Sequence, residues 1–251
     1  MKKLRLIARI DVKNEYAIKG IQLEGLRKVG DPNKLASKYY QSGIDEIIFM
    51  DAVAAYYDRN SLSDIIDRAT KDIFVPITVG GGIRTIEDIR TALKAGADKV
   101  AINTQAIKRL EFVEEASKVF GSQCVVASIT AKRVGDGTYL AYYDNGREET
   151  DRDVVGWAKT LQEGGAGEIM LTSIDMEGTR KGFDIDLVRM IKEAVSIPVI
   201  AGGGAGKNGH LSELVGQTGV DAVAVASMLH YDLASVGELK SHLGNRGFIT
   251  R

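Results

Sequence analysis

Short runs of apolar residues alternate along the chain with longer segments of mixed polarity. The runs lie at residues 4–10, 45–50, 75–79, 98–103, 123–129, 167–172, 198–201 and 220–226. Two of them, EIIFM at 46–50 and QCVVA at 123–127, are apolar on both faces. This pattern is typical of parallel β-strands that are covered by helices.

The segments between these runs repeat their apolar residues at helical spacing. They lie at residues 32–40, 86–94, 108–119, 154–162, 185–194 and 236–243. Two helix starts are well marked, because Thr85 precedes an acidic first turn and Pro32 follows an aspartate. Eight strand–helix units in about 250 residues have the size and rhythm of an α/β (β/α)8 barrel.

The second half of the chain repeats the first. VPITVGGG at 75–82 returns as IPVIAGGG at 197–204, an offset of 122 residues. A doubly wound open sheet would not predict equivalent halves. We therefore expect a single (β/α)8 TIM barrel over residues 1–251, built from half-barrels at about 1–121 and 122–251.

Two long segments interrupt this rhythm. Residues 132–149, after the fifth strand, contain Asp136-Gly137 and Asn145-Gly146, which favour tight β-turns and predict a hairpin insertion. The loop from Gly20 to Gly30, after the first strand, is a candidate lid. Both would lie at the carboxyl ends of the strands, where barrels of this class have their active sites.

Composition narrows the function classes. With 33 basic and 34 acidic residues the net charge is −1, which gives no electrostatic reason to expect nucleic-acid or membrane-surface binding. Cys124 is the only cysteine, and the three histidines lack metal-ligand spacing, so neither a disulfide nor a metal or other cofactor is expected. There is no signal-peptide core and no membrane-length apolar run. We expect a reduced, cytoplasmic protein.

Both triple-glycine segments predict phosphate-binding turns, because glycine lets backbone N–H groups approach an anion. One glycine cluster alone is equally well explained by a tight turn. Two clusters in register predict a substrate with a phosphate at each end. The two predicted cradles comprise Gly81, Gly82, Asn103 and Thr104, and Gly203, Gly204, Ala226 and Ser227.

Polar residues that end other strands are candidates for the chemistry. Asp11 closes the first strand, where a carboxylate is placed to act as a general acid or base, although a loop-capping role is the alternative. Asp51, in the matching position of the second strand, is equally compatible with a ligand contact or a structural role. Thr172 and Ser173 end the sixth strand and are candidate substrate contacts.

In these and other sequence blocks the chain resembles the cyclase subunit of imidazole glycerol phosphate synthase, a histidine-biosynthesis enzyme. The similarity covers essentially the whole length and includes DVK at 11–13, VGGGIR at 79–84, FGSQC at 120–124 and GAGEI at 165–169. The resemblance implies that a glutaminase subunit docks on the N-terminal face of the barrel, forming a heterodimer. Ammonia from that subunit would travel along the barrel axis to a bis-phosphorylated small-molecule substrate.

The resemblance also implies an ammonia gate made of four charges that point into the barrel. Burying charges is costly unless they pair, and two positive with two negative charges can close a ring. Asp98 would lie near the partner interface. The gate residues are Arg5, Glu46, Lys99 and Glu168.

Several positions on the catalytic rim depart from the family pattern, and three of them bear on the chemistry. The family ends its fifth strand in a second catalytic aspartate, whereas this chain has Thr130, which cannot hold a charge at neutral pH. The cysteine before the first-strand motif is Arg9 here. The aspartate that precedes the second-half Gly-Thr pair is Glu177, beside Gly178, and both are implied substrate contacts.

Three functions stay open. In the family reaction, ammonia attacks the ribulosyl carbonyl of a bis-phosphorylated aminoimidazole carboxamide nucleotide, giving imidazole glycerol phosphate and aminoimidazole carboxamide ribotide. Asp11 would be the general acid/base with Lys19 assisting, and Thr130 would only orient substrate or water. Alternatively, a paralogous barrel amidates a sugar for surface polysaccharide, or a non-catalytic subunit conducts ammonia or holds its glutaminase. The matching phosphate sites and gate put the family reaction first.

Overall fold

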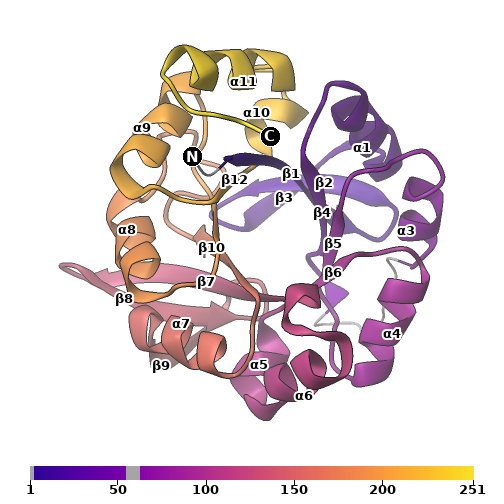
Figure 1. Cartoon of the computed structure of the whole chain (residues 1–251), viewed down its shortest axis with the longest axis vertical. Helices are drawn as coiled ribbons and strands as arrows, with labels where there is room; N and C mark the ends of the chain where they lie inside the picture. The colour runs from indigo at the N-terminus through magenta and orange to yellow at the C-terminus, as the bar shows by residue number, and fades with distance from the viewer. Residues whose placement is uncertain (1–2, 55–62) are drawn as a thin grey trace.

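Eight parallel strands close into a barrel in the computed structural model, which describes residues 3–54 and 63–251 (Figure 1). In spatial order they are β1 (Arg5–Lys13), β4 (Glu46–Asp51), β5 (Ile77–Gly80), β6 (Lys99–Ile102), β7 (Val125–Gly135), β10 (Glu168–Ser173), β11 (Val199–Gly202) and β12 (Ala222–Val225). The barrel is closed because β12 pairs in parallel with β1, with Arg5 opposite Ala222. The predicted TIM barrel is confirmed.

Helices surround the strands on the outside of the barrel (Figure 1). They are α1 (Pro32–Gln41), α3 (Ser63–Ala69), α4 (Ile86–Lys94), α5 (Thr104–Lys108), α6 (Glu111–Phe120), α7 (Val154–Glu163), α8 (Ile185–Ala194), α9 (Asn208–Thr218), α10 (Ser227–His230) and α11 (Val236–Asn245). None of the helices in the described ranges is long and apolar enough to cross a membrane.

Most helix predictions are confirmed, and the exceptions have local causes. The helix expected at 108–119 begins only at Glu111, because Arg109 is extended and separates it from α5. Helices α3 and α9 are not among the segments named above from the sequence. Helix α9 contains Gly209 and Gly216, which weaken both helix propensity and the apolar stripe.

The predicted helix starts have the expected capping bonds. The Asp31 side chain accepts hydrogen bonds from the backbone of Asn33 and Lys34, with Pro32 at the first helical position. Thr85 and Asp88 form a reciprocal capping box at the start of α4. These bonds satisfy backbone donors that a helix leaves unpaired at its N-terminus.

The core has two layers, as strands that are apolar on both faces require. One side of each strand packs outward against the helices, as Leu6 and Phe49 do. The other side fills the barrel. Its buried residues are Ile7, Ile48, Ala101, Val126, Met170, Ile200, Ala222 and Ala224.

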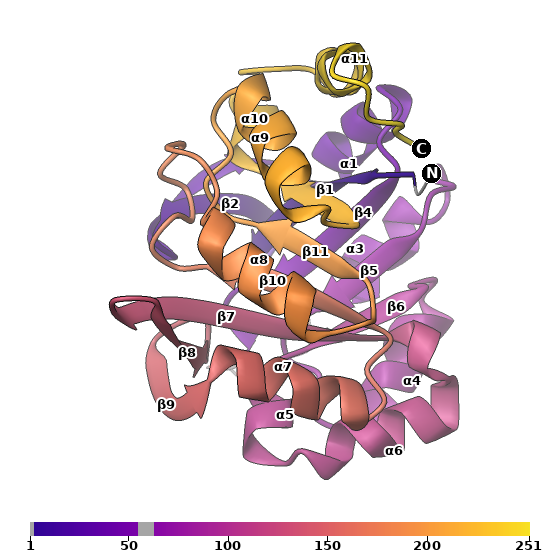
Figure 2. The ribbon, with the colours of Figure 1, turned by 60° about the vertical axis from the view of Figure 1, so that its left-hand side comes forward.

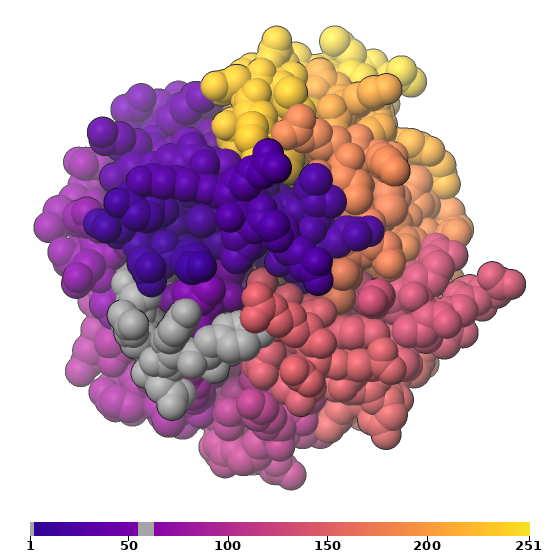
Figure 3. Space-filling view, turned by 180° about the vertical axis from the view of Figure 1, so that it is seen from behind, coloured from indigo at the N-terminus to yellow at the C-terminus, as the bar shows by residue number. Residues whose placement is uncertain are grey.

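Two antiparallel additions stand beside the barrel (Figure 2). The segment expected to be a loop from Gly20 to Gly30 instead forms a hairpin of β2 (Tyr16–Ile21) and β3 (Glu24–Gly30), with β2 paired to β1. β7 continues beyond the barrel and pairs with β8 (Thr138–Tyr143), which pairs with β9 (Glu148–Asp153). Figure 3 shows the face turned away in Figure 1, with the indigo β2–β3 hairpin lying across its middle.

The two chain ends meet at the opposite face. The backbone N–H of Leu4 donates to the carbonyl of Ile249 over 2.8 Å, and the N–H of Arg251 donates to the carbonyl of Leu4 over 3.0 Å. The end of the chain is thereby fixed beside the start of β1.

Candidate active site

Each predicted phosphate cradle is assembled around a cavity at the carboxyl ends of the strands. Glycine turns after β5 and β11 each face a strand that leads into a short helix, α5 or α10. The first cavity is lined by Gly81, Gly82, Asn103 and Thr104, together with Asp51 and Thr130. The second is lined by Gly203, Gly204, Ala226 and Ser227, together with Lys19, Glu177 and Gly178.

The glycines of both turns are required by the backbone. Gly81 has φ +88° and Gly204 has φ +107°, which L side chains rarely adopt. A Cβ at Gly81 would overlap the carbonyl oxygen of Asp51, and one at Gly204 would overlap the carbonyl oxygen of Gly182. The repeated glycines therefore fix the paths of two equivalent turns.

Gly204→Ala is expected to lower the free energy of unfolding by about 1–3 kcal/mol, because both the left-handed backbone and the Gly182 carbonyl exclude a methyl group. Urea unfolding measures this loss. Gly209→Ala is the matched control, since nothing lies within 4 Å of its added Cβ on helix α9. The control should be neutral or slightly stabilising. Equal stability of Gly204→Ala and the control would contradict the requirement for glycine at 204.

An unpaired buried atom marks the first cavity. The amide nitrogen of Asn103 donates to Thr130 Oγ1 and to the Tyr142 carbonyl, each over 3.2 Å. The amide oxygen of Asn103 is buried and has no hydrogen-bond partner among the described residues. Because such orphaned atoms are costly, this oxygen is suited to accept a bond from a ligand or water.

Asp11 lies in a buried cluster of charges with Arg9, which lines both cavities, and Lys19, which lines the second, although Asp11 itself lines neither. Arg9 Nε donates to Asp11 Oδ1 over 2.8 Å, and Lys19 Nζ lies 3.5 Å from Asp11 Oδ2. Lys19 also pairs with Glu177. Burial alone would raise the pKa of Asp11, but the charges of Arg9 and Lys19 bring that pKa below its ordinary value. Asp11 is therefore ionised at neutral pH and able to accept a proton.

Lys19 and His230 respond to the same cluster. Burial lowers the pKa of Lys19, with Asp11 opposing that change and Arg9 adding to it. Burial and the Lys19 charge lower the pKa of His230 to about 4, so its ring is neutral at neutral pH. The His230 Nδ1 atom lies 2.7 Å from the Tyr39 hydroxyl. No group of His, Cys, Asp or Glu in the described ranges is arranged to hold a metal ion.

The remaining predicted substrate contacts are buried in different surroundings. Thr130 faces the first cavity and accepts the Asn103 bond. Thr172 accepts a hydrogen bond from Arg9 Nη1 over 2.9 Å. Ser173 is buried with its hydroxyl unpaired among the described atoms, and Asp51 Oδ1 accepts a bond from the backbone of Val53. Neither Thr172 nor Ser173 lines the two cavities, and their contact with substrate stays a prediction.

Arg9 is the residue that sequence reasoning missed. It was recognisable only as a departure from the family pattern, yet it lines both cavities and bonds Asp11 and Thr172. The signal available in the sequence was its position. Residues 5, 7, 9 and 11 alternate along β1 and share its inner face.

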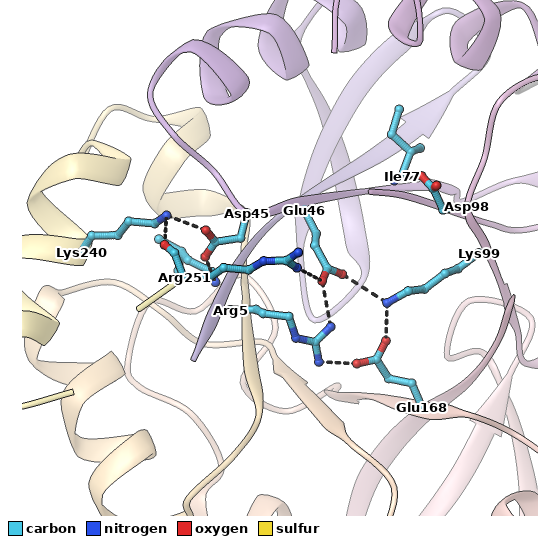
Figure 4. Close-up of polar contacts among 10 residues, drawn as sticks. Arg5, Asp45, Glu46, Ile77, Asp98, Lys99, Glu168, Lys240 and Arg251 are labelled. Carbon is cyan, nitrogen blue, oxygen red and sulfur yellow. Dashed lines mark hydrogen bonds and ion pairs between the residues drawn. The ribbon is translucent and has the colours of Figure 1, made fainter. Parts of the chain in front are cut away.

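Four charges form a closed ring inside the other end of the barrel (Figure 4). Arg5 pairs with Glu46 over 3.0 Å and with Glu168, while Lys99 pairs with Glu168 over 2.9 Å and with Glu46 over 3.3 Å. Burial would lower the pKa of Arg5, but Glu168 and Glu46 together raise it above its ordinary value. The contacts expected of these four residues are present, and a gating function stays a prediction.

Three aspartates tie neighbouring strands together at this same end. Asp98 Oδ2 accepts the backbone N–H of Ile77 over 2.8 Å (Figure 4). In the same way Asp45 binds the N–H of Leu6 over 2.7 Å, and Asp221 binds the N–H of Val199 over 2.8 Å. Asp98 is exposed, so its structural bond leaves it accessible to a partner.

Comparison with known proteins agrees with this geometry. The model of the family described as histidine biosynthesis protein matches residues 5–235. The chain is 56% identical over 207 residues to the imidazole glycerol phosphate synthase subunit HisF of Legionella pneumophila, covering 82% of this chain and 98% of that protein. It is 45% identical over 265 residues to the subunit of the same name from Methanopyrus kandleri, covering 98% of this chain and 97% of that protein.

Proposed function

The chain belongs to the histidine biosynthesis protein family, as a cyclase subunit of imidazole glycerol phosphate synthase, and from this premise we propose how its residues perform the reaction. The substrate is a bis-phosphorylated ribulosyl aminoimidazole carboxamide nucleotide. Ammonia converts it to imidazole glycerol phosphate and aminoimidazole carboxamide ribotide. The observation that supports this assignment best is the pair of equivalent glycine cradles that share Arg9, the residue bonded to the buried carboxylate of Asp11.

The two cradles hold the two ends of the substrate. Backbone N–H groups of each glycine turn and of the short helix opposite bind one phosphate. The side chains of Asp51, Glu177 and Thr172 contact the part of the substrate between the phosphates, with Ser173 and Gly178. This arrangement places the reacting carbon near Asp11.

Asp11 is the general acid/base of the proposed reaction. Asp11 is ionised at rest and takes a proton from the attacking ammonia. Lys19 assists this proton transfer by stabilising the Asp11 carboxylate. Thr130 has no charge to exchange. Its hydroxyl, held by Asn103, orients substrate or water.

Ammonia enters from the opposite face in this proposal. A glutaminase subunit docks where the strands begin, beside Asp98, and releases ammonia into the barrel axis. The ring of Arg5, Glu46, Lys99 and Glu168 closes that entrance and opens when the partner is active. The apolar lining above the ring, which includes Ile48 and Val126, suits neutral ammonia better than ammonium.

Restoring a carboxylate at the end of β7 tests the assignment. The purified protein is expected to turn over the nucleotide with an ammonium salt above the rate without enzyme. Thr130→Asp is expected to raise that rate by about 10²-fold or more, because a second general acid/base typically contributes 10²–10⁴-fold. Steady-state assays of imidazole glycerol phosphate formation measure both.

Thr138→Asp is the matched control, because it adds the same charge at an exposed position on β8. It should leave the rate unchanged. No turnover by the unaltered protein and no gain in Thr130→Asp would contradict the nucleotide as substrate and favour a sugar acceptor.

A further inference from the structure

Arg9 lies across the barrel interior. Its strand, β1, is neighboured by β4 and β12, yet Arg9 bonds to Thr172 on β10, which belongs to neither neighbour. Arg5, two inward-facing positions earlier on the same strand, reaches Glu168 on β10 in the same way. The Arg9 guanidinium therefore lies over the axis, above the ring of charges and the apolar lining that includes Ile7.

One terminal nitrogen of this guanidinium has no hydrogen bond within the described residues. Its Nε donates to Asp11 and its Nη1 donates to Thr172, but Nη2 has no hydrogen-bond partner in the described part of the chain. The side chain is only 9% exposed, and Arg9 lines both cavities. A charged donor without a protein partner beside a cavity is suited to bind an electron-rich atom of a ligand.

The placement of Arg9 identifies which part of the ligand it meets. A substrate with one phosphate in each cradle must pass over the residue that lines both cavities. Ammonia that arrives along the axis reaches the substrate at the same place. In the proposed reaction, the carbonyl that ammonia attacks is therefore the group expected beside Arg9.

Resting on the proposed function, we propose that Arg9 is a catalytic residue that donates a hydrogen bond to the attacked carbonyl oxygen and stabilises the negative charge formed on it. Preorganised donors of this kind are among the largest contributions to catalysis. With Thr130 in place of a second carboxylic acid, no acid on β7 can protonate that oxygen.

The addition step balances with the residues present. The nitrogen lone pair forms the C–N bond, and the π pair of the carbonyl moves to the oxygen, which accepts the Arg9 N–H bond. One proton leaves the new ammonium group for the Asp11 carboxylate and passes from there to the oxygen. The product is a neutral carbinolamine, and Arg9 takes part only as a hydrogen-bond donor and transfers no proton.

Replacing Arg9 separates this function from an indirect effect on Asp11. Arg9→Gln removes the charge, and Arg9→Lys keeps a charge without the planar fork. Both are assayed at saturating substrate and fixed free-ammonia concentration, with the pH raised until the rate reaches its plateau. We expect kcat on the plateau to fall about 10²–10³-fold in Arg9→Gln and less in Arg9→Lys, while KM for the nucleotide changes far less.

The plateau is the decisive readout, because Arg9, Lys19 and His230 act on the pKa of Asp11 and Glu177 pairs with Lys19, so any loss could act through that pKa. If kcat of Arg9→Gln is low near neutral pH but equals that of the unaltered protein on the plateau, Arg9 only keeps Asp11 ionised, which overturns the proposal. If kcat of Arg9→Gln equals that of the unaltered protein at every pH, the proposal is overturned as well.

One control variant and one fallback variant make failures distinguishable. Arg189→Gln, which removes a surface arginine on α8, should leave kcat unchanged.

If urea unfolding shows that Arg9→Gln is not folded, the result with Arg9→Lys decides. A kcat plateau tenfold or more below that of the unaltered protein supports the proposal, and an equal plateau overturns it. Absence of turnover in the unaltered protein overturns the proposed function itself and this inference with it.

Discussion

Asp11→Asn is expected to lower the rate of ammonia-dependent product formation by about 10²–10⁴-fold, the largest effect on activity that the site predicts. An amide cannot accept the proton that leaves the attacking ammonia. The substitution also takes the negative charge from between Arg9 and Lys19, so two buried cations lose their shared partner. Steady-state kinetics with an ammonium salt measure the loss of activity, and urea unfolding measures the loss of stability.

Asp186→Asn is the matched control, because its carboxylate pairs with Arg189 on the surface of α8. It should change neither the rate nor the stability appreciably. If Asp11→Asn formed product in the glutaminase complex at the unaltered rate, the chain would be a non-catalytic, ammonia-conducting subunit.

Arg5→Met is expected to lower the free energy of unfolding by about 3 kcal/mol, the largest expected effect on stability. Glu168 is buried and would keep only the Lys99 bond, while Glu46 would keep the Lys99 bond and a longer ion pair with Arg251 at 3.8 Å. Removing one partner of a buried ion pair typically costs 3–5 kcal/mol. Urea unfolding measures the change. In the proposed route, ammonia added from solution does not have to pass the ring. The ammonia-dependent rate should therefore be affected much less than the glutamine-dependent rate of the complex.

Arg109→Met is a matched control for this loss. Arg109 pairs with Glu115 through both terminal nitrogens, over 2.8 and 2.9 Å, but both side chains are nearly half exposed. Exposed pairs contribute about 1 kcal/mol or less. Equal losses in Arg5→Met and Arg109→Met would contradict the view that the ring is held by buried pairing.

The barrel and the positions of its site were predictable because they depend on patterns that repeat. Strands apolar on both faces indicated a covered parallel sheet, and the two glycine triplets predicted two turns at strand ends, each of which lines a cavity. The ring of charges was identified through the family resemblance, and the cost of burying unpaired charges then predicted that its members pair.

The features that could not be predicted from the sequence depend on contacts between distant segments. The β2–β3 hairpin turns at Gln22 and Leu23, with φ of +52° and +65°, where no Asn-Gly or Asp-Gly pair marks a turn. Arg9 looked like an interruption of an apolar strand. Its importance comes from Thr172, which lies 163 residues away in sequence and across the barrel.

The aspartates at the strand starts have a consequence for the ring of charges. A slip of one residue between neighbouring strands would turn every inward side chain outward. Asp45 binds the amide that follows Arg5, and Asp98 immediately precedes Lys99, so each bond fixes the alignment next to a ring residue. The surface on which we propose that the glutaminase docks and the charges inside the barrel thus share one set of alignment bonds. A partner bound at that surface would act on the ring through these bonds.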